Sequence, residues 1–450
     1  MKLLFRFKLL LICFMMIAVT SHGQEPTSFS LKEAQQYALK NNAQVKNALL
    51  DIEKAKKKIW ETTAMGLPQI NGNVDYTYMP TIPEMQFSVV THGELQPDGI
   101  TVLLNSMDVP IALGVPSSAT ISVSASQLVF SGSYIVGLQT SKTFKQLSEQ
   151  SLILSENTVL ENVANTYYMV LAAEESKTLL KATSENMVKT LDEFKAMLAE
   201  GFIENTDVDQ LQYTVTMIEN AYKMLERQVQ IANRLLKFQM GMDLDQQITL
   251  TDKLDEIINN IPAADMFSTG GDINNNITYK LLNTQESLQE SLVKLEKSAY
   301  LPTIAAFYQH QEKTSKADFD FTFPDIVGVS VSVPIFSSGM RNTKVAQAKI
   351  ELEKTRNTKE MAIQGLKLEI QQTQITLQSA YEKFLNEKSN QELTQKIYDK
   401  TLIKYKEGMA SSMDLTQANS QYLTAQTNYF NALLELLTAK NKLDNLLNRK

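Results

Sequence analysis

Few side chains in this sequence have the types and the spacing that catalysis needs. The only cysteine is Cys13, and two of the three histidines, His92 and His310, lie far apart in the chain. The sequence has no H-E-x-x-H pattern, no G-x-S-x-G motif and no glycine-rich phosphate loop. Adjacent carboxylates such as Glu174 and Glu175 fall in a helical pattern, where a solvated surface is the expected role. We therefore expect no enzyme, no cofactor and no metal site.

Composition narrows the classes further. The chain has 43 Lys and Arg against 50 Asp and Glu, a formal net charge of -7, which argues against nucleic acid as a partner. With 43% hydrophobic and 21% charged residues, it is neither a disordered chain nor a polytopic helical membrane protein. Asp318 and Asp320 form an acidic pair that suggests either a cation site or a solvated loop, and we favour the loop.

Residues 1–23 have the pattern of a secretory signal peptide. A basic start is followed by an apolar run at 9–20 that is too short to span a membrane, and small residues precede a cleavage point before Gln24. Cleavage removes Cys13, so we expect the mature chain to have no disulfide and no thiolate metal ligand. A lipid anchor on Cys13 is disfavoured because the apolar run continues past it.

Two long stretches are nearly free of residues that break helices. Residues 139–200 contain no proline or glycine, and residues 340–407 contain only Gly365. Proline and glycine weaken helices, so these stretches predict two helices of about 90 and 100 Å. Apolar residues recur at heptad spacing in both, which predicts coiled-coil packing. These residues are Leu180, Met187, Leu191, Phe194 and Leu198, and then Ile363, Ile370, Leu377 and Phe384.

Shorter elements complete the pattern. Residues 31–65 and 207–240 predict two helices, the first of which begins with a capping box at Ser30 and Glu33. Strict alternation of apolar and polar residues predicts strands with two different faces. The predicted strands are 69–78, 119–126, 303–311 and 328–333. The segments between them, 79–118 with its five prolines and 311–324, are predicted to be loops.

The chain is internally duplicated. Residues 66–70 correspond to 300–304, and residues 200–210 correspond to 407–417 at a constant offset. Each half contributes one strand pair, and four strands are too few to close a barrel, so closure requires several copies of the chain. The expected divisions are a first repeat at 24–241, an equatorial segment or linker at 242–276, and a second repeat at 277–450.

In the order of its elements and in its duplicated spacing, the sequence resembles the TolC family of outer-membrane efflux channels. Leu67-Pro68 and Leu301-Pro302 before the strands carry the resemblance, together with the glycine turns that follow the long helices. The resemblance implies a membrane α+β fold. Four transmembrane β-strands per protomer would complete a trimeric twelve-stranded β-barrel, which a long periplasmic α-helical coiled-coil barrel continues.

The resemblance also implies a function. The protein would be the trimeric channel of a tripartite efflux or type I secretion system in the outer membrane of a Gram-negative bacterium. It would passively conduct substrates from an inner-membrane pump and a periplasmic adaptor by opening a periplasmic helical gate. Its partners would be its own copies, the adaptor, the pump and outer-membrane lipid. A periplasmic coiled-coil adaptor is the alternative, although it should carry a single helical hairpin instead of a duplicated pattern.

The gate residues follow from the resemblance. Asp207 and Tyr405 match a latch pair, and Ala410 occupies the position of the expected latch arginine. Asp414 and Gln417 match two carboxylate-ring positions, of which only the first is charged here. Because Asp207 and Asp414 both follow turns, each also suits an N-terminal helix cap.

The two turns match the surfaces that meet the adaptor. These surfaces are Gly201 with Phe202, and Gly408 with Met409. A tight turn between antiparallel helices would by itself explain both glycines.

Overall fold

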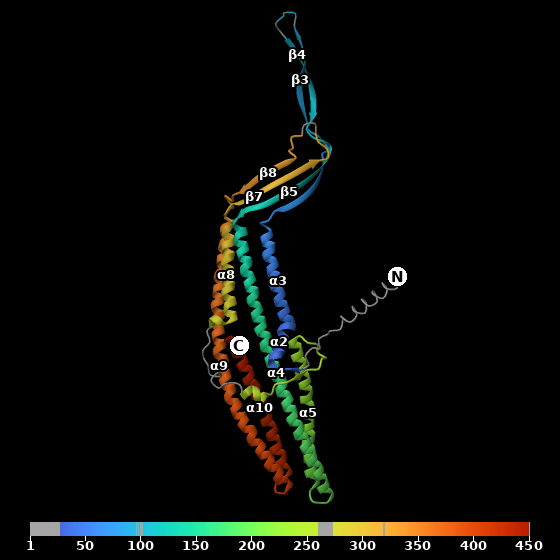
Figure 1. Cartoon of the computed structure of the whole chain (residues 1–450), viewed down its shortest axis with the longest axis vertical. Helices are drawn as coiled ribbons and strands as arrows, with labels where there is room; N and C mark the ends of the chain where they lie inside the picture. Colours follow the sequence, from blue (N-terminus) through green and yellow to red (C-terminus); the bar gives the residue numbers. More distant parts are fainter. Residues whose placement is uncertain are drawn as a thin grey trace, which may run out of the picture. The chain divides into compact units, whose positions relative to one another are not determined.

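The computed structural model describes residues 28–449, except 96, 98, 100, 101, 260–272 and 318–319. The predicted signal peptide and Asp318 therefore lie outside the described residues. The chain forms two compact units, and Figure 1 shows the order of their elements. The first unit comprises Met1–Leu49, Leu152–Tyr279 and Gln364–Lys450, and the second comprises Leu50–Ser151 and Lys280–Ile363.

Two helices dominate the chain. They are α4 (Gly132–Ala199) and α9 (Met340–Lys406), which confirms both predicted long helices. The first begins earlier than predicted because the preceding strand passes directly into it, with the Ser131 hydroxyl accepting from Tyr134 N at 3.3 Å. None of the helices in the described ranges is long and apolar enough to span a membrane.

Three shorter helices accompany the long ones. They are α5 (Asn205–Met240), α8 (Ile277–Ser298) and α10 (Ser412–Leu446). Ion pairs join α8 to α9 within the second unit, where Glu286 accepts from Arg356 at 2.8 Å and from Lys359 at 2.7 Å. These two cations hold the pKa of Glu286 below its ordinary value.

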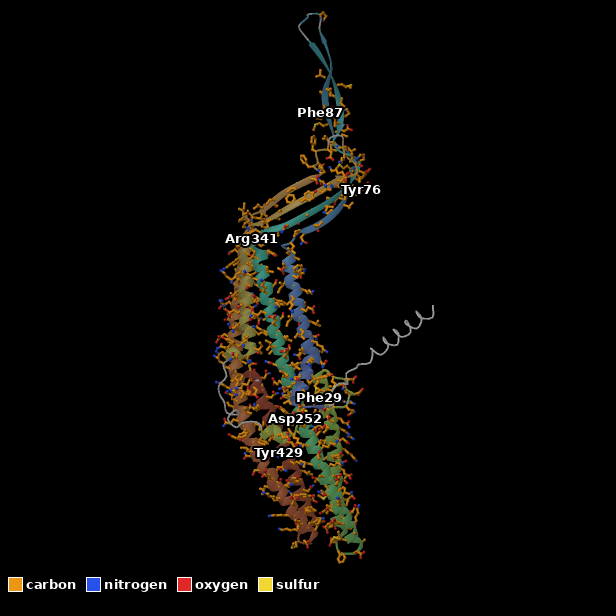
Figure 2. All side chains as sticks on the ribbon, in the orientation of Figure 1. Phe29, Tyr76, Phe87, Asp252, Arg341 and Tyr429 are labelled. Carbon is orange, nitrogen blue, oxygen red and sulfur yellow. The ribbon has the colours of Figure 1, made fainter. Side chains whose placement is uncertain are left out.

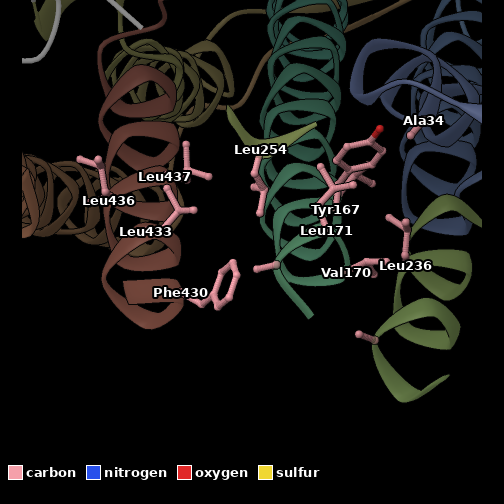
Figure 3. Close-up of a cluster of buried hydrophobic side chains, with 14 of the residues drawn as sticks. Ala34, Tyr167, Val170, Leu171, Leu236, Leu254, Phe430, Leu433, Leu436 and Leu437 are labelled. Carbon is pink, nitrogen blue, oxygen red and sulfur yellow. The ribbon is translucent and has the colours of Figure 1, made fainter. Parts of the chain in front are cut away.

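The first unit has a continuous apolar core. Figure 3 shows Tyr167 and Leu171 of α4, Leu236 of α5 and Leu437 of α10 in this core. Leu377 and Phe384 of the predicted heptad pattern also lie in this core. The core residues drawn in Figure 3 include Ala34, Val170, Leu254, Phe430, Leu433 and Leu436.

Short elements surround the core of the first unit. They are β1 (Ser28–Phe29), which pairs in parallel with β6 (Thr249–Leu250), then α6 (Leu254–Asn259) and the 3-10 helix η1 (Ile273–Asn275). Asp252, between β6 and α6, joins this segment to α2 and α4, because its Oδ2 accepts from the backbone nitrogen of Leu31 at 2.7 Å and lies 3.1 Å from the hydroxyl of Tyr167.

The predicted single helix at 31–65 is wrong, because the structure has two helices there. They are α2 (Leu31–Asn41), with the predicted Ser30–Glu33 capping box, and α3 (Ala43–Ala64). Asn42 is extended between them. Its side chain accepts from Gln44 N at 2.7 Å and donates to Gln239 O at 2.7 Å, so a contact with α5 stabilises the break.

The second unit contains one four-stranded antiparallel sheet. Its strands, in spatial order, are β2 (Gln69–Tyr78), β5 (Ser117–Ser131), β7 (Thr303–Lys313) and β8 (Asp325–Ser332). This arrangement confirms the four predicted strands. Among the described residues, β2 and β8 each pair on one side only, so the sheet has two open edges.

The register brings alternate apolar residues onto one face of the sheet. Ile70 pairs with Ala125, Ala125 with Tyr308, and Tyr308 with Val327, which forms a row across all four strands. Ile70 is 73% exposed and Val327 81% exposed, so the residues that the structure describes do not cover this face. Tyr76 lies on the same face, further along β2 (Figure 2).

The predicted loop at 79–118 is also wrong, because most of it forms a second, two-stranded sheet. The strands β3 (Glu84–Leu95) and β4 (Val102–Ala112) pair along their whole length, with a register shift after Val90. The loop was predicted because this segment contains five prolines. A strand of a two-stranded hairpin has a free edge, which tolerates Pro110 because no ladder partner needs its missing N–H.

A comparison of Gly241 with Gly408 shows how closely the end of α5 packs against the end of α2. Gly241 has φ 73°, and a Cβ built there would lie 2.6 Å from the Asn41 carbonyl oxygen. Gly408 has φ 72°, but a Cβ there would meet nothing within 4 Å. Alanine at either position costs about 1–2 kcal/mol for the left-handed backbone, and only Gly241→Ala adds a backbone clash.

We therefore expect Gly241→Ala to lower the midpoint of thermal unfolding more than Gly408→Ala does. Circular dichroism of the detergent-solubilised protein measures both midpoints. Equal shifts for the two variants would show that the Asn41 backbone moves aside without cost.

Candidate functional site

The two glycine turns at the helix ends have the same backbone hydrogen bonds. In each, the glycine N–H donates to the carbonyl three residues earlier, and the next N–H donates to the carbonyl five residues before it, at 2.8–3.0 Å. Gly201 and Gly408 have φ of 79° and 72°, the left-handed conformation of a Schellman motif. Backbone hydrogen bonds therefore close both turns.

The residues that follow these glycines present large apolar side chains to solvent. Phe202 is 76% exposed and Met409 is 70% exposed. A turn that is already closed by backbone hydrogen bonds does not need either side chain. Exposed apolar groups of this size indicate a contact surface.

A buried cluster lies next to the turns; we call it the tip cluster. It includes Phe194, Leu211, Tyr405 and Leu415, from all four helices that meet the turns. The rings of Phe194 and Tyr405 are stacked, with centroids 4.4 Å apart. Ala410 packs against this cluster, so the position of the absent latch arginine is partly buried and apolar.

Tyr405 is buried, but its hydroxyl has no hydrogen-bond partner among the described residues. Burial, and then the negative charge of Asp207, raise the pKa of Tyr405 to about 12. The structure thus brings the predicted latch residues Asp207 and Tyr405 near each other without a hydrogen bond between them in the single chain.

Asp207 instead contacts a residue that the sequence analysis did not select. The buried Ser412 hydroxyl lies 2.5 Å from Asp207 Oδ1 and 2.6 Å from the Gln210 side-chain oxygen. One serine hydroxyl can donate only one hydrogen bond, and the carboxylate is the stronger acceptor. The next turn adds a bond of 3.2 Å between Thr214 and Thr416. These contacts join α5 to α10.

The predicted carboxylate-ring residues have different surroundings. Asp414 accepts from Ser411 N at 2.9 Å and from the Ser411 hydroxyl at 2.7 Å, which completes a capping box at the start of α10. These two bonds lower the pKa of Asp414 below its ordinary value. Gln417 is exposed and lines a groove of about 470 Å³ with Glu387 and Asn390. Asp414 therefore is a helix cap, whereas Asp207 makes no cap bond.

Buried polar residues continue along the same face of α10. Ser412, Asn419 and Gln426 are spaced by seven residues and are all at most 5% exposed. Among the described residues, Asn419 Oδ1 and Gln426 Nε2 have no partner. Polar residues at a core heptad position weaken a helix seam and fix its register.

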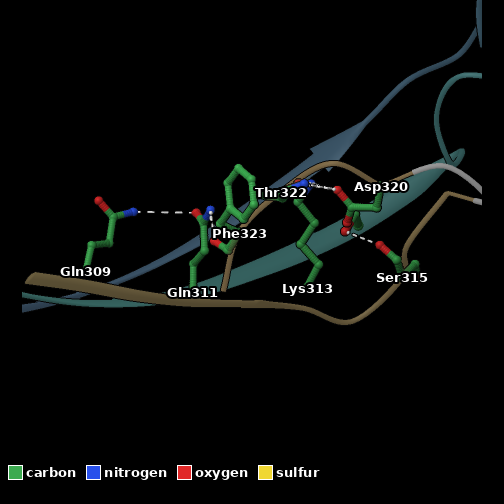
Figure 4. A network of polar contacts seen from close by, with 8 residues as sticks. Gln309, Gln311, Lys313, Ser315, Asp320, Thr322 and Phe323 are labelled. Carbon is green, nitrogen blue, oxygen red and sulfur yellow. Dashed lines mark hydrogen bonds and ion pairs between the residues drawn. The ribbon is translucent and has the colours of Figure 1, made fainter. Parts of the chain in front are cut away.

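The loop between β7 and β8 carries the acidic residue that suggested a cation site. Asp320 accepts from Lys313 at 3.3 Å and from Thr322 N at 2.9 Å, and Gln311 donates to Phe323 O at 3.2 Å (Figure 4). These bonds occupy the carboxylate and shape the loop. In the part of the chain that the structure describes, no group of three His, Cys, Asp or Glu residues is placed to hold a metal ion.

The described residues form two repeats of a long and a short helix and one open antiparallel sheet with an exposed apolar face. The model of the family described as "Outer membrane efflux protein" matches residues 34–242 and 283–449, so the chain belongs to this family. The resemblance expected from the sequence is therefore confirmed.

Known proteins agree with this assignment. The chain is 22% identical over 337 residues to the outer membrane protein TolC of Salmonella enteritidis, a match that covers 71% of this chain and 61% of that relative's length. The fold is similar to the Campylobacter jejuni CmeC outer membrane channel, with a TM-score of 0.69, 16% identity and coverage of 93% and 85% of the two chains.

A third similarity is to the open state of the Neisseria gonorrhoeae MtrE outer membrane channel. Its TM-score is 0.70, with 14% identity and coverage of 93% and 88% of the two chains. The fold class predicted from the sequence is confirmed by these structures. Both similar structures are described as outer membrane channels.

Proposed function

We propose that this protein is the trimeric outer-membrane channel of a tripartite efflux or type I secretion system. It conducts substrates passively from an inner-membrane pump and a periplasmic adaptor to the outside of a Gram-negative cell, with its long helices in the periplasm. Family membership supports the outer-membrane location. The observation that carries the proposal is the four-stranded sheet with two open edges and an exposed apolar face.

The open edges require partner strands. Unpaired N–H and C=O groups along β2 and β8 cannot be satisfied in hydrocarbon, so strands that cross a bilayer belong to a closed barrel. Pairing β8 of one copy with β2 of the next satisfies both edges, and three copies supply twelve strands. The apolar row that runs from Ile70 to Val327 then faces lipid.

The divisions at 24–241, 242–276 and 277–450 fit this proposal, because each repeat supplies one strand pair and one pair of long and short helices. The segment 242–276 contains the short elements β6, α6 and η1 and is anchored to α5 by Lys237, which donates to Gln246 O at 3.0 Å. The boundaries themselves stay predictions.

The gate is proposed at the helix tips. Asp207 and Ser412 join α5 to α10 through a charge-assisted hydrogen bond, and Tyr405 lies against the same carboxylate. Such a bond is stronger than a neutral one and is still breakable when a partner docks. In this proposal, the Asp207–Ser412 bond serves instead of the latch arginine, because the arginine position is occupied by Ala410. This bond must break before α5 can separate from α10.

Single-channel conductance in planar bilayers tests both the channel and its gate. Asp207→Ala and Ser412→Ala should raise the conductance of the closed channel, because each removes the bond between α5 and α10. Tyr405→Phe should raise it less, since its hydroxyl has no partner in the single chain. Thr216→Ala is the matched control, because this hydroxyl bonds only within α5.

Unchanged conductance in both Asp207→Ala and Ser412→Ala would remove this pair from the gate while leaving the channel intact. Absence of any conductance from a purified wild-type trimer would overturn the proposed function itself.

Asp414 and Gln417 are proposed to face the pore just inside the entrance, with Asp414 supplying one ring of three carboxylates. Such a ring favours cations. Asp414→Asn should therefore weaken cation selectivity, measured as the reversal potential in a salt gradient. Ser411 lowers the pKa of Asp414, so the charge persists as the pH falls. In Ser411→Ala the pKa rises, and selectivity should be lost at a higher pH. Selectivity that ignores both changes would place this carboxylate away from the pore.

The tips formed by Gly201 with Phe202 and Gly408 with Met409 are proposed to contact the adaptor. Phe202→Asp and Met409→Asp should weaken binding of the co-purified adaptor by at least about tenfold, the effect of losing about 1.4 kcal/mol of apolar contact. Surface plasmon resonance measures this affinity. Met224→Asp is the control, because Met224 is similarly exposed, at 69%, but lies far along α5 from the turn. Equal losses in all three variants would contradict a contact confined to the tips.

A further inference from the structure

The hairpin formed by β3 and β4 has no role in the proposed conduction, and it is built as a ribbon with two different faces. The two strands form a sheet of their own, separate from the four-stranded sheet. Between residues 84 and 90 of β3, alternate side chains pair directly with those of β4 without any shift in register. The faces of this segment are therefore fixed by the pairing.

Within this segment, one face of the ribbon carries only apolar side chains. Its cross-strand pairs are Met85 with Ile111, Phe87 with Val109, and Val89 with Met107. The side chains of Met85, Phe87, Val89 and Met107 are between 47% and 59% exposed, and Phe87 is labelled on the hairpin in Figure 2. The described residues of the chain therefore leave this face uncovered.

The opposite face is mostly polar. Glu84, Gln86 and Ser88 point to that side, and the Ser88 hydroxyl donates to Asp108 at 2.5 Å. A two-stranded hairpin is at best marginally stable in water by itself, and one with a single apolar face is expected to bury that face against a partner. The contrast between the faces indicates which side is covered.

The position of the hairpin in the chain indicates what covers it. The pairing of β2 with β5 continues into the hairpin through two backbone bonds, Met79 N to Pro116 O and Leu113 N to Pro83 O, each of 2.9 Å. The hairpin thus continues directly from β2, the edge strand that meets the next copy in the proposed trimer. The proposed trimer therefore has three hairpins at the same end of the channel.

Tethering at one mouth favours the copies over any free partner. Groups held together by short connections reach effective concentrations in the millimolar range, so a modest apolar contact suffices to keep them together. Three-fold symmetry also presents the same face of every ribbon to the axis.

We propose that the apolar faces of the three β3–β4 hairpins pack against one another above the outer mouth of the channel. This inference rests on the trimer of the proposed function. The packed faces place the side chains of Phe87, Val89 and Met107 across the exit path. The channel would then have an apolar constriction at its outer end in addition to the periplasmic gate.

Two adjacent valines provide a matched test. Val89 and Val90 are 49% and 56% exposed and lie on opposite faces of the ribbon. In a Cys13→Ser background, which removes the only cysteine, Val89→Cys and Val90→Cys are treated in isolated outer membranes with a bis-maleimide spanning about 10 Å, the face-to-face distance of packed sheets. We expect cross-linked dimers of the chain from Val89→Cys and several-fold fewer from Val90→Cys.

Native electrophoresis of each variant reports the trimer separately. An intact trimer in which the two cysteines cross-link equally, or not at all, would overturn the packing of the hairpins while leaving the channel. A cross-linked product containing a different protein would show another partner on this face and would also overturn the proposal. Absence of a trimer from the parent chain would sink the proposed function and this inference together.

A second pair of variants avoids dependence on cysteine chemistry. Phe87→Asp places a charge in the packed face, and Ser88→Asp places the same charge on the polar face. Added protease should cleave the hairpin of Phe87→Asp several-fold faster than that of Ser88→Asp, with the trimer retained. Equal cleavage rates in the two variants would contradict a covered apolar face.

Discussion

Backbone hydrogen bonding at the two edges of the four-stranded sheet is the constraint on which the rest of the structure depends. Within the described residues, β2 and β8 are paired on one side only, and the register places an exposed apolar row across the sheet. Lipid can cover the apolar row, but it cannot satisfy the unpaired backbone groups of β2 and β8, because hydrocarbon offers no hydrogen bonds. In the proposed trimer, the strands of the neighbouring copies satisfy the edges while lipid covers the apolar row. The duplicated helices then follow, since each strand pair continues into one long helix.

The two tips have the same backbone hydrogen bonds but different side-chain contacts. Both turns end in a left-handed glycine with the same hydrogen bonds, but the helices that follow begin differently. Ser411 ties Asp414 into a capping box, whereas α5 begins without a side-chain cap, which leaves Asp207 available to Ser412. Position in the turn therefore does not decide a carboxylate's role; the competing local donor does. The polar seam that continues through Asn419 and Gln426 lies on the same face of α10.

Local patterns predicted most of the fold and few of the contacts. The strand at 69–78 and the long helix from 340 were predicted almost to the residue, because alternation and the lack of proline are local properties. The break at Asn42 was missed because its cause is a contact with α5, nearly two hundred residues later. Ser412 was missed for the same reason, since its partner Asp207 lies in the other repeat. The hairpin at 84–112 was missed because prolines are tolerated on free strand edges.

Backbone hydrogen bonds close the turns after α4 and α9, and the exposed side chains of Phe202 and Met409 take no part in them. Phe202 and Met409 contribute only their backbone N–H groups to the hydrogen bonds that close these turns, and a Cβ at Gly201 or Gly408 would meet no neighbour. Natural selection can therefore exchange the two exposed residues without disturbing the helices beneath them. With the proposed docking role of the tips, a few substitutions at these two positions would suffice to change the partner, while the left-handed glycines stay fixed.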